Sequence, residues 1–112
     1  MSLQLLKIET LLEEFRKLDS EIASHCMLAL CYIARQDEAG SPATVKDVGI
    51  RLRVSSASAS RNVAMLSEWN RHNVKGFDLV STYENPKYRI EKFIKLTPKG
   101  KRVVKSLEDL MK

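Results

Sequence analysis

The residues most able to do chemistry lie between Ser55 and Leu66, where serines, one asparagine and one arginine alternate with apolar residues. Ala59, Val63 and Leu66 recur at spacings of four and three, which places them on one face of a predicted helix. The polar residues fall largely on its other faces: Ser56, Ser58, Ser60, Arg61 and Asn62. Together with Ala57 they make a small, polar, cationic surface. Short side chains of this kind suit a helix that enters the major groove of DNA, because they let the backbone approach the base edges.

A shorter helix is predicted immediately before this one. Thr44 is its N-cap candidate, because the hydroxyl can accept a hydrogen bond from a free N–H group of the first turn. The apolar residues that then share one face are Val45, Val48 and Leu52. Val54 fills the turn, and Ser55 is the N-cap candidate of the second helix, which could extend to Trp69. Residues 44–69 therefore predict a helix-turn-helix, and an exposed serine-rich helix in an ordinary helical bundle is the alternative interpretation.

Length and charge narrow the choice of partners. The 112 residues fit a single domain, residues 1–112, with one core. Residues 1–43 carry four basic and seven acidic side chains, residues 44–70 four and two, and residues 71–112 eleven and five. A basic surplus that begins with the helix pair indicates a polyanion, either DNA or an anionic membrane.

The membrane is the weaker of these two interpretations. The longest nearly apolar stretch, Cys26 to Ala34, has nine residues, whereas a membrane-spanning helix needs about twenty. No N-terminal segment has the pattern of a secretory signal. We therefore expect a cytoplasmic protein without a membrane partner.

Cysteine and histidine spacing gives little support for other chemistry. Cys26 and Cys31 would lie about 140° apart around a helix, so we expect two buried thiols and no disulfide. A redox-sensing role stays open, although only His25 and Arg35 are near enough to lower a thiol pKa. His25 and His72 are far apart and no CxxC or HxxxH spacing occurs, so neither a metal nor another cofactor is expected. No nucleophile and base pair, phosphate loop or carboxylate pair stands out, which argues against an enzyme.

Two further helices are predicted before the helix pair. Residues 3–18 form an amphipathic helix that could pack on its own domain or on a second subunit, with an apolar stripe of Leu5, Ile8, Leu12 and Phe15. Asp19 or Ser20 is the N-cap candidate of the next helix. That helix is apolar nearly all round and should form the core, through Ile22, Cys26, Ala29, Leu30 and Ile33. A turn over residues 36–42 then leads to Thr44.

Strand-like runs follow a polar loop at residues 70–76. Residues 77–84 and 88–96 are rich in β-branched and aromatic side chains, and Asn85, Pro86 and Lys87 between them predict a hairpin loop. In the second run the alternation of a strand places four apolar side chains on one face: Tyr88, Ile90, Ile94 and Leu96. Thr97 then caps a final helix with Pro98 at its first position. The apolar face of that helix consists of Val103, Val104, Leu107, Leu110 and Met111.

This order predicts a mainly α protein with a small β-hairpin, namely a winged helix-turn-helix with flanking N- and C-terminal helices and a wing at residues 77–96. The pattern over roughly residues 20–112 resembles the MarR family of bacterial and archaeal transcription regulators. In the helix pair the resemblance is carried by Thr44, Asp47, Val48, Gly49, Leu52, Val54, Ser55, Ala59, Ser60, Arg61, Val63 and Leu66. The hairpin that ends in Leu96-Thr97-Pro98-Lys99-Gly100 is the more specific part of the match.

The resemblance implies that the second helix of the pair enters the major groove and that the wing reaches the neighbouring backbone or minor groove of double-stranded DNA. The helix contacts would come from Ser56, Ala57, Ser58, Ser60, Arg61 and Asn62, and the wing contacts from Lys87 and Arg89. Ser60 and Arg61 match the Ser-Arg dipeptide of the family. Of the Asp-Arg-Arg sequence that the family wing often carries, only Arg89 is retained.

The resemblance also implies a homodimer that binds a palindromic operator, with residues 1–18 and 98–112 as the dimerisation helices. Typical members are longer, and the connection from Leu66 to Gly76 is longer here than is usual. Many members bind phenolic compounds or oxidants, but no small-molecule effector is identified for this chain. The alternatives are a winged-helix DNA-binding protein of replication, partition, or phage or plasmid control, and a protein–protein interaction module.

Overall fold

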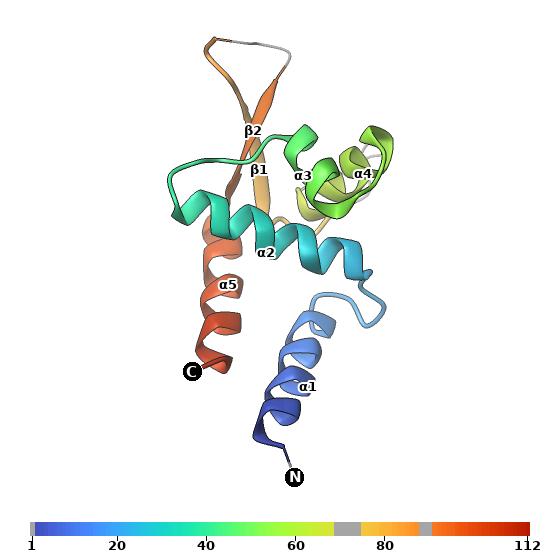
Figure 1. Ribbon diagram of the computed structural model, residues 1–112, viewed down its shortest axis with the longest axis vertical. Coiled ribbons are helices and arrows are strands. Elements are labelled where there is room, and N and C mark those ends of the chain that lie inside the picture. Colours follow the sequence, from blue (N-terminus) through green and yellow to red (C-terminus); the bar gives the residue numbers. More distant parts are fainter. Residues whose placement is uncertain (1, 69–74, 88–90) are drawn as a thin grey trace.

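The computed structural model describes residues 2–68, 75–87 and 91–112, in which five helices and one antiparallel hairpin follow one another (Figure 1). The helices are α1 (Leu3–Arg16), α2 (Ser24–Glu38), α3 (Val45–Leu52), α4 (Ser56–Leu66) and α5 (Pro98–Leu110), and the strands are β1 (Val80–Glu84) and β2 (Lys92–Leu96). The predicted fold class, a mainly α winged helix-turn-helix with flanking helices, is confirmed. No described helix is long and apolar enough to cross a membrane.

The central helix α2 forms the middle of the core. Figure 1 shows it between the terminal helices on one side and the hairpin and the α3–α4 pair on the other. Its buried residues recur at helical spacing: Cys26, Ala29, Leu30, Ile33 and Ala34. They belong to one hydrophobic cluster with buried residues of every other described helix and of both strands. Each large aliphatic side chain buried there contributes about 1.5–3 kcal/mol, so α2 holds the helix pair and the hairpin together.

The predicted start of α2 is wrong. Neither Asp19 nor Ser20 caps it; the helix begins at Ser24 after Ala23, whose side chain offers no cap. Asp19 instead caps a turn, since its Oδ1 accepts from the N–H of Glu21 at 2.9 Å. Arg16 donates through Nε to the carbonyl of Ser20 at 2.9 Å. These bonds keep residues 19–22 out of the helix and turn the chain from α1 into α2.

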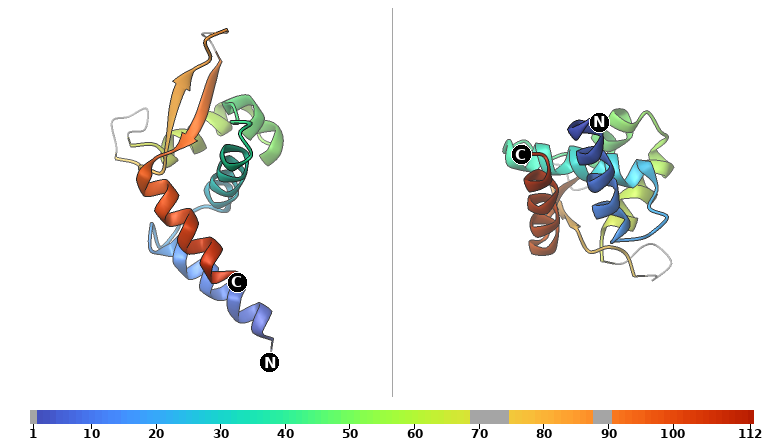
Figure 2. Two further views of the ribbon diagram at one scale, coloured as in Figure 1. Left: turned by 90° about the vertical axis from the view of Figure 1, so that its left-hand side faces the viewer. Right: turned by 90° about the horizontal axis from the view of Figure 1, so that it is seen from below.

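The described strands of the hairpin are shorter than the predicted runs, 77–84 and 88–96. β1 and β2 pair antiparallel from Val80 opposite Leu96 to Glu84 opposite Lys92. The predicted loop at residues 85–87 is wrong, because Glu84 pairs with Lys92 and the N–H of Asn85 donates to the carbonyl of Glu91 at 3.1 Å. Ile94 and Leu96 are buried, as their predicted shared face requires, whereas residues 88–90 lie outside the described part of the chain. Figure 2 shows the hairpin projecting from the helical body.

The Leu-Thr-Pro-Lys-Gly sequence joins the hairpin to α5. The Thr97 hydroxyl accepts from the N–H of Gly100 at 2.9 Å, which confirms the predicted cap, and donates to the carbonyl of Asp78 at 2.7 Å. The N–H of Thr97 also donates to the carbonyl of Leu79 at 3.0 Å. A Cβ atom on Gly100 would collide with that same carbonyl. Glycine therefore lets the first turn of α5 lie directly against the residues that lead into β1.

The two terminal helices leave the body on the same side (Figure 2). α1 is anchored at its C-terminal end by Phe15, which is buried, and by Leu11, which packs against the core. Its remaining apolar side chains are 44–69% exposed: Leu3, Leu5, Leu6, Ile8 and Leu12. On α5, Val104 and Leu107 are buried, whereas Met111, which directly follows the helix, is exposed. Most of the apolar stripe of α1 is thus about half or more exposed to solvent.

Candidate nucleic-acid interface

The first helix of the pair is fixed by a reciprocal cap. The Thr44 hydroxyl accepts from the N–H of Asp47 at 3.1 Å, and an Asp47 carboxylate oxygen accepts from the N–H of Thr44 at 3.0 Å. Two of the free N–H groups at this helix end are satisfied in this way. The helix ends at Leu52, and Arg53 adopts a left-handed conformation with φ 58°. The predicted Thr44 cap is confirmed, and it sets where α3 starts.

Small residues lie where α3 contacts α4, namely Gly49 on α3 and Ala59 on α4. A Cβ on Gly49 would lie 3.4 Å from the Cβ of Ala59, which is an ordinary van der Waals distance, so an alanine would also fit at this position. The N–H of Val54 donates to the carbonyl of Gly49 at 3.0 Å. The Ser55 hydroxyl then accepts from the N–H of Ser58 at 3.1 Å, which confirms Ser55 as the N-cap of α4.

The outer face of α4 is formed by residues of the predicted set. Ala59, Val63 and Leu66 are buried against the core, as their spacing predicts. The exposed members of the predicted set are Ser56, Ala57, Ser60 and Arg61. The ion pairs in the described part of the chain join Lys17 to Glu14 and both Lys105 and Lys112 to Asp109, so Arg61 takes part in none of them. Its guanidinium is therefore available to an external anion or base.

Two members of the predicted set, Ser58 and Asn62, are half-buried. The Oδ1 of Asn62 lies 3.6 Å from the thiol of Cys26 on α2, which donates to it. At about 100° per residue, Asn62 lies only about 60° from the buried Ala59 around the helix axis. Helical spacing therefore favours a half-buried Asn62, whereas its polarity alone favours an exposed one.

α4 ends earlier than predicted. Its last residue is Leu66, and Ser67 has an extended backbone with ψ 176°, so the proposed extension to Trp69 is wrong. The Ser67 hydroxyl donates to the carbonyl of Val63 at 2.8 Å. The N–H of Leu79 donates to the carbonyl of Leu66 at 2.8 Å, which brings the chain back against the end of α4. Trp69 and most of the polar loop, residues 69–74, lie outside the described residues.

The wing is tied directly to the start of the helix pair. Thr44 forms a bridge with Phe93 of β2, and the N–H of Ile94 donates to the carbonyl of Ala43 at 2.9 Å. Thr44 is buried and also caps α3. One residue therefore fixes both the start of the first helix and its position against β2, so the helix pair and the wing are held in a defined relation.

Of the predicted wing contacts, Lys87 is described and Arg89 lies outside the described residues. Lys87 is exposed, and its N–H donates to Oδ1 of Asn85 at 2.9 Å within the loop. Below the loop, the rings of Tyr83 and Phe93 pack with centroids 5.6 Å apart, and the ammonium of Lys95 lies 5.5 Å from the Tyr83 centroid. Such cross-strand contacts stiffen a hairpin of only two strands.

Sequence reasoning did not assign two exposed cations beside α4. Lys46 and Arg53 line a surface groove of about 570 Å³ where α3 meets the start of α4, together with Ile50 and Ser56. The signal was present in the sequence, since both residues belong to the basic surplus that begins at residue 44. The groove places two positive charges next to the exposed end of α4.

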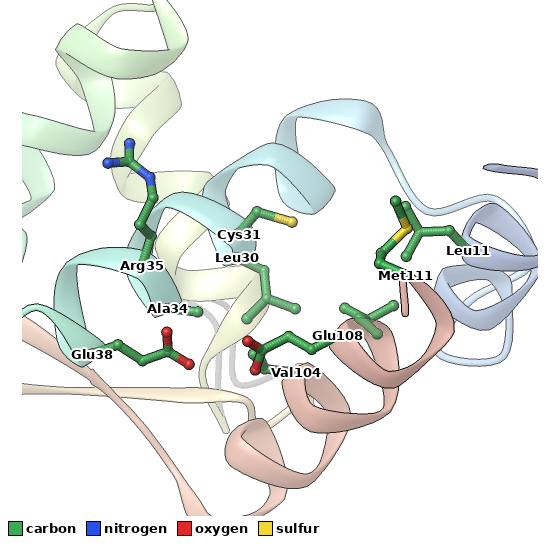
Figure 3. Close-up of a pocket in the computed structure, with 10 residues that line it drawn as sticks. Leu11, Leu30, Cys31, Ala34, Arg35, Glu38, Val104, Glu108 and Met111 are labelled. Atoms are coloured by element: carbon green, nitrogen blue, oxygen red, sulfur yellow. The ribbon is translucent and has the colours of Figure 1, made fainter. Parts of the chain in front are cut away.

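A second pocket lies away from α4, between the terminal helices and α2. It has a volume of about 370 Å³ and an almost wholly apolar lining. Figure 3 shows Leu11 and Met111 together at one end and the carboxylates of Glu38 and Glu108 facing each other at the other. Cys31 also lines it, and the prediction that this residue is buried is wrong, whereas Cys26 is buried as predicted.

Both thiols are free, and both have raised pKa values. Burial raises the pKa of Cys26, with a smaller contribution from the negative charge of Asp19. Cys31 is exposed as a residue, but the side chains around its thiol still exclude enough water to raise its pKa. A raised pKa lowers the thiolate fraction and with it the reactivity toward oxidants. Among the described residues, no group of three or more His, Cys, Asp and Glu could hold a metal ion.

Comparison with known proteins shows which solved structures share this fold. No protein-family model and no curated protein matches the chain. The crystal structure of the S. aureus MepR–DNA complex is 18% identical over 96% of this chain and 75% of its own, with a TM-score of 0.71. MarR is 13% identical over 99% and 76% with a TM-score of 0.63, and the PcaV transcriptional regulator from Streptomyces coelicolor is 20% identical over 81% and 56% with a TM-score of 0.58. The chain has the fold of these MarR-family structures, so the resemblance that the sequence indicated is confirmed at the level of the fold.

Proposed function

We propose that this protein is a sequence-specific double-stranded DNA-binding transcription regulator that binds a palindromic operator as a homodimer. The observation that carries the proposal is the outer face of α4, where Ser56, Ala57, Ser60 and Arg61 are exposed next to a tight turn. In a helix-turn-helix, the second helix places such residues against base edges in the major groove. The MepR structure, which has the same fold, is a complex with DNA. Like the regulators it resembles, the protein would act in the cytoplasm and without catalysis.

Phosphate contacts would flank the base contacts. Lys46 and Arg53 are exposed beside the start of α4 and would contact the DNA backbone on one side of the major groove. Lys87 and Arg89 of the wing would meet the adjacent backbone or minor groove, where a guanidinium is attracted by the strong negative potential of A/T-rich DNA. Each phosphate neutralised in this way releases counterions, so binding should weaken steeply with added salt.

The dimer part of the proposal rests on α1. Five large apolar side chains on one short helix are about half or more exposed, which is more than a monomeric surface usually carries in one place. The apolar pocket between α1, α2 and α5 continues this surface. A two-fold axis through these helices would set the two α4 helices about 34–36 Å apart, one turn of DNA, and would select an inverted repeat.

Selection of bound sequences from random duplexes tests the whole proposal. We expect an enriched inverted repeat whose half-sites are one helical turn apart. Arg61→Ala should weaken binding to the selected duplex, whereas Arg102→Ala, an exposed arginine on α5, should not. Binding without enrichment would favour a sequence-independent role in replication or partition. If sedimentation at micromolar concentration detects only a monomer, with and without duplex, the proposal of a homodimer on a palindromic operator is wrong.

A further inference from the structure

The two outermost positions of α4 are one helical turn apart and differ in chemistry. Ala57 and Arg61 are both exposed and lie about 40° from each other around the axis, on the side opposite the buried Ala59. One presents only a methyl group, the other a planar guanidinium. Four residues of helix advance the chain by about 6 Å, which is close to two base-pair steps of 3.4 Å each.

Each of these groups matches one feature of the major groove. The thymine C5-methyl is the apolar group that a base presents there, and alanine is a side chain that contacts it. A guanidinium matches the paired O6 and N7 acceptors of guanine. The exposed hydroxyls of Ser56 and Ser60 discriminate poorly, because serine can donate to or accept from several bases.

The amide of α4 is directed elsewhere. Adenine is read by a side-chain amide that donates to N7 and accepts from N6, so the amide oxygen and nitrogen must both be free. The Oδ1 of Asn62 instead accepts from the buried thiol of Cys26, and Asn62 itself is half-buried. This leaves methyl contact and guanine recognition as the discriminating chemistry of the exposed face.

We propose that each half-site of the operator presents a thymine methyl to Ala57 and a guanine to Arg61, about two base pairs apart. This inference rests on the DNA-binding function proposed above and specifies its ligand. The bases between and beside these two positions would be selected by shape and by phosphate contacts, so the half-site would tolerate substitution there.

Modified duplexes test the two contacts separately. In the selected operator, deoxyuridine replaces each thymine in turn, which removes one methyl group, and 7-deazaguanine replaces each guanine, which removes N7. For the wild-type protein we expect one thymine position where binding weakens about fourfold. We also expect one guanine position where it weakens about fivefold or more, because one of the two acceptors is lost.

Matched variants assign each contact to its residue. The sensitive guanine should become indifferent to deaza substitution in Arg61→Ala, and the sensitive thymine indifferent to methyl removal in Ala57→Gly. Glycine at an exposed helix position lowers the stability of the helix, so circular dichroism is used to check that Ala57→Gly is folded. The scan of modified duplexes with the wild-type protein does not depend on that variant. Sensitive positions more than three base pairs apart, or sensitivity that persists in Arg61→Ala, overturn the inference and leave the DNA-binding function standing. If selection enriches no duplex at all, the proposed function and this inference both fall.

Discussion

The thiol of Cys26 on α2 donates to Oδ1 of Asn62 on α4 at 3.6 Å. This contact links the inner side of α4, the helix proposed to enter the major groove, to the central helix of the core. Because of this contact, the amide oxygen of Asn62 is directed toward the core, whereas the neighbouring Arg61 is exposed. It also gives Cys26 a hydrogen-bond acceptor in an otherwise apolar cluster.

This geometry predicts that two neighbouring substitutions, Arg61→Ala and Asn62→Ala, differ in their effect on the affinity for DNA. Arg61→Ala should lower affinity for the selected duplex by about 1–3 kcal/mol, because an outward guanidinium that reads a base is lost. Asn62→Ala should change affinity by less than about 0.5 kcal/mol, since the amide oxygen of Asn62 is directed inward, toward the thiol of Cys26. Titration of labelled duplex at fixed salt measures both, and a larger loss for Asn62→Ala would mean that Asn62 turns outward on binding.

The Thr44 cap predicts a stability effect in the absence of DNA. Thr44→Ala removes the acceptor for the N–H of Asp47 and should lower the free energy of unfolding by about 1–2 kcal/mol, as measured by urea denaturation. Thr44→Ser keeps the hydroxyl and should retain most of that stability. Equal losses in the two variants would show that packing of the buried methyl group matters more than the cap.

Gly100 predicts a larger effect that comes from packing. Gly100→Ala would place a methyl group against the carbonyl of Leu79, which already accepts from the N–H of Thr97. The start of α5 would have to move, so we expect the free energy of unfolding to fall by about 3 kcal/mol. Lys101→Ala, at an exposed position on the same turn, should change it by less than about 0.5 kcal/mol. A small loss in Gly100→Ala would mean that the turn before α5 adjusts easily.

The features that could be predicted from the sequence are those that depend on interactions between residues a few positions apart in the chain. The caps at Thr44, Ser55 and Thr97 each depend on an acceptor three residues before its N–H donor, and all three are confirmed. The start of α2 depends instead on how residues 19–22 are held between two helices, through bonds such as that from Arg16 to Ser20. A local pattern contains no such information.

The cysteines show the same limit. Cys26 and Cys31 stand on one apolar helix, and composition alone predicts that both are buried. Whether a face of that helix is covered depends on where α1 and α5 pack, and they leave a pocket at Cys31. In α4, by contrast, the half-burial of Asn62 follows from helical spacing and could have been predicted.

The raised thiol pKa values predict a pH dependence of stability. Above about pH 8 the thiols of the unfolded chain begin to lose protons that the folded protein retains. The unfolded state then binds fewer protons than the folded state, so the free energy of unfolding falls as pH rises. Urea denaturation between pH 7.5 and 9.5 should show a shallower fall for the Cys26→Ala, Cys31→Ala double variant than for the wild type. Identical slopes would contradict the assigned shifts.

The exposed α1 stripe predicts a dimer that one charge can disrupt. Leu5 is 61% exposed in the monomer, so Leu5→Glu should cost little folding stability while it places a carboxylate in the proposed apolar interface. We expect sedimentation equilibrium to show at least a tenfold weaker dimer for Leu5→Glu. Gln4→Glu adds the same charge at the neighbouring exposed position and serves as the control. Because the monomer keeps its α4 face, Leu5→Glu should still bind an isolated half-site with wild-type affinity while it loses the advantage of the full inverted repeat. Equal weakening by both variants would indicate a general charge effect, and no weakening by either would place the dimer interface elsewhere.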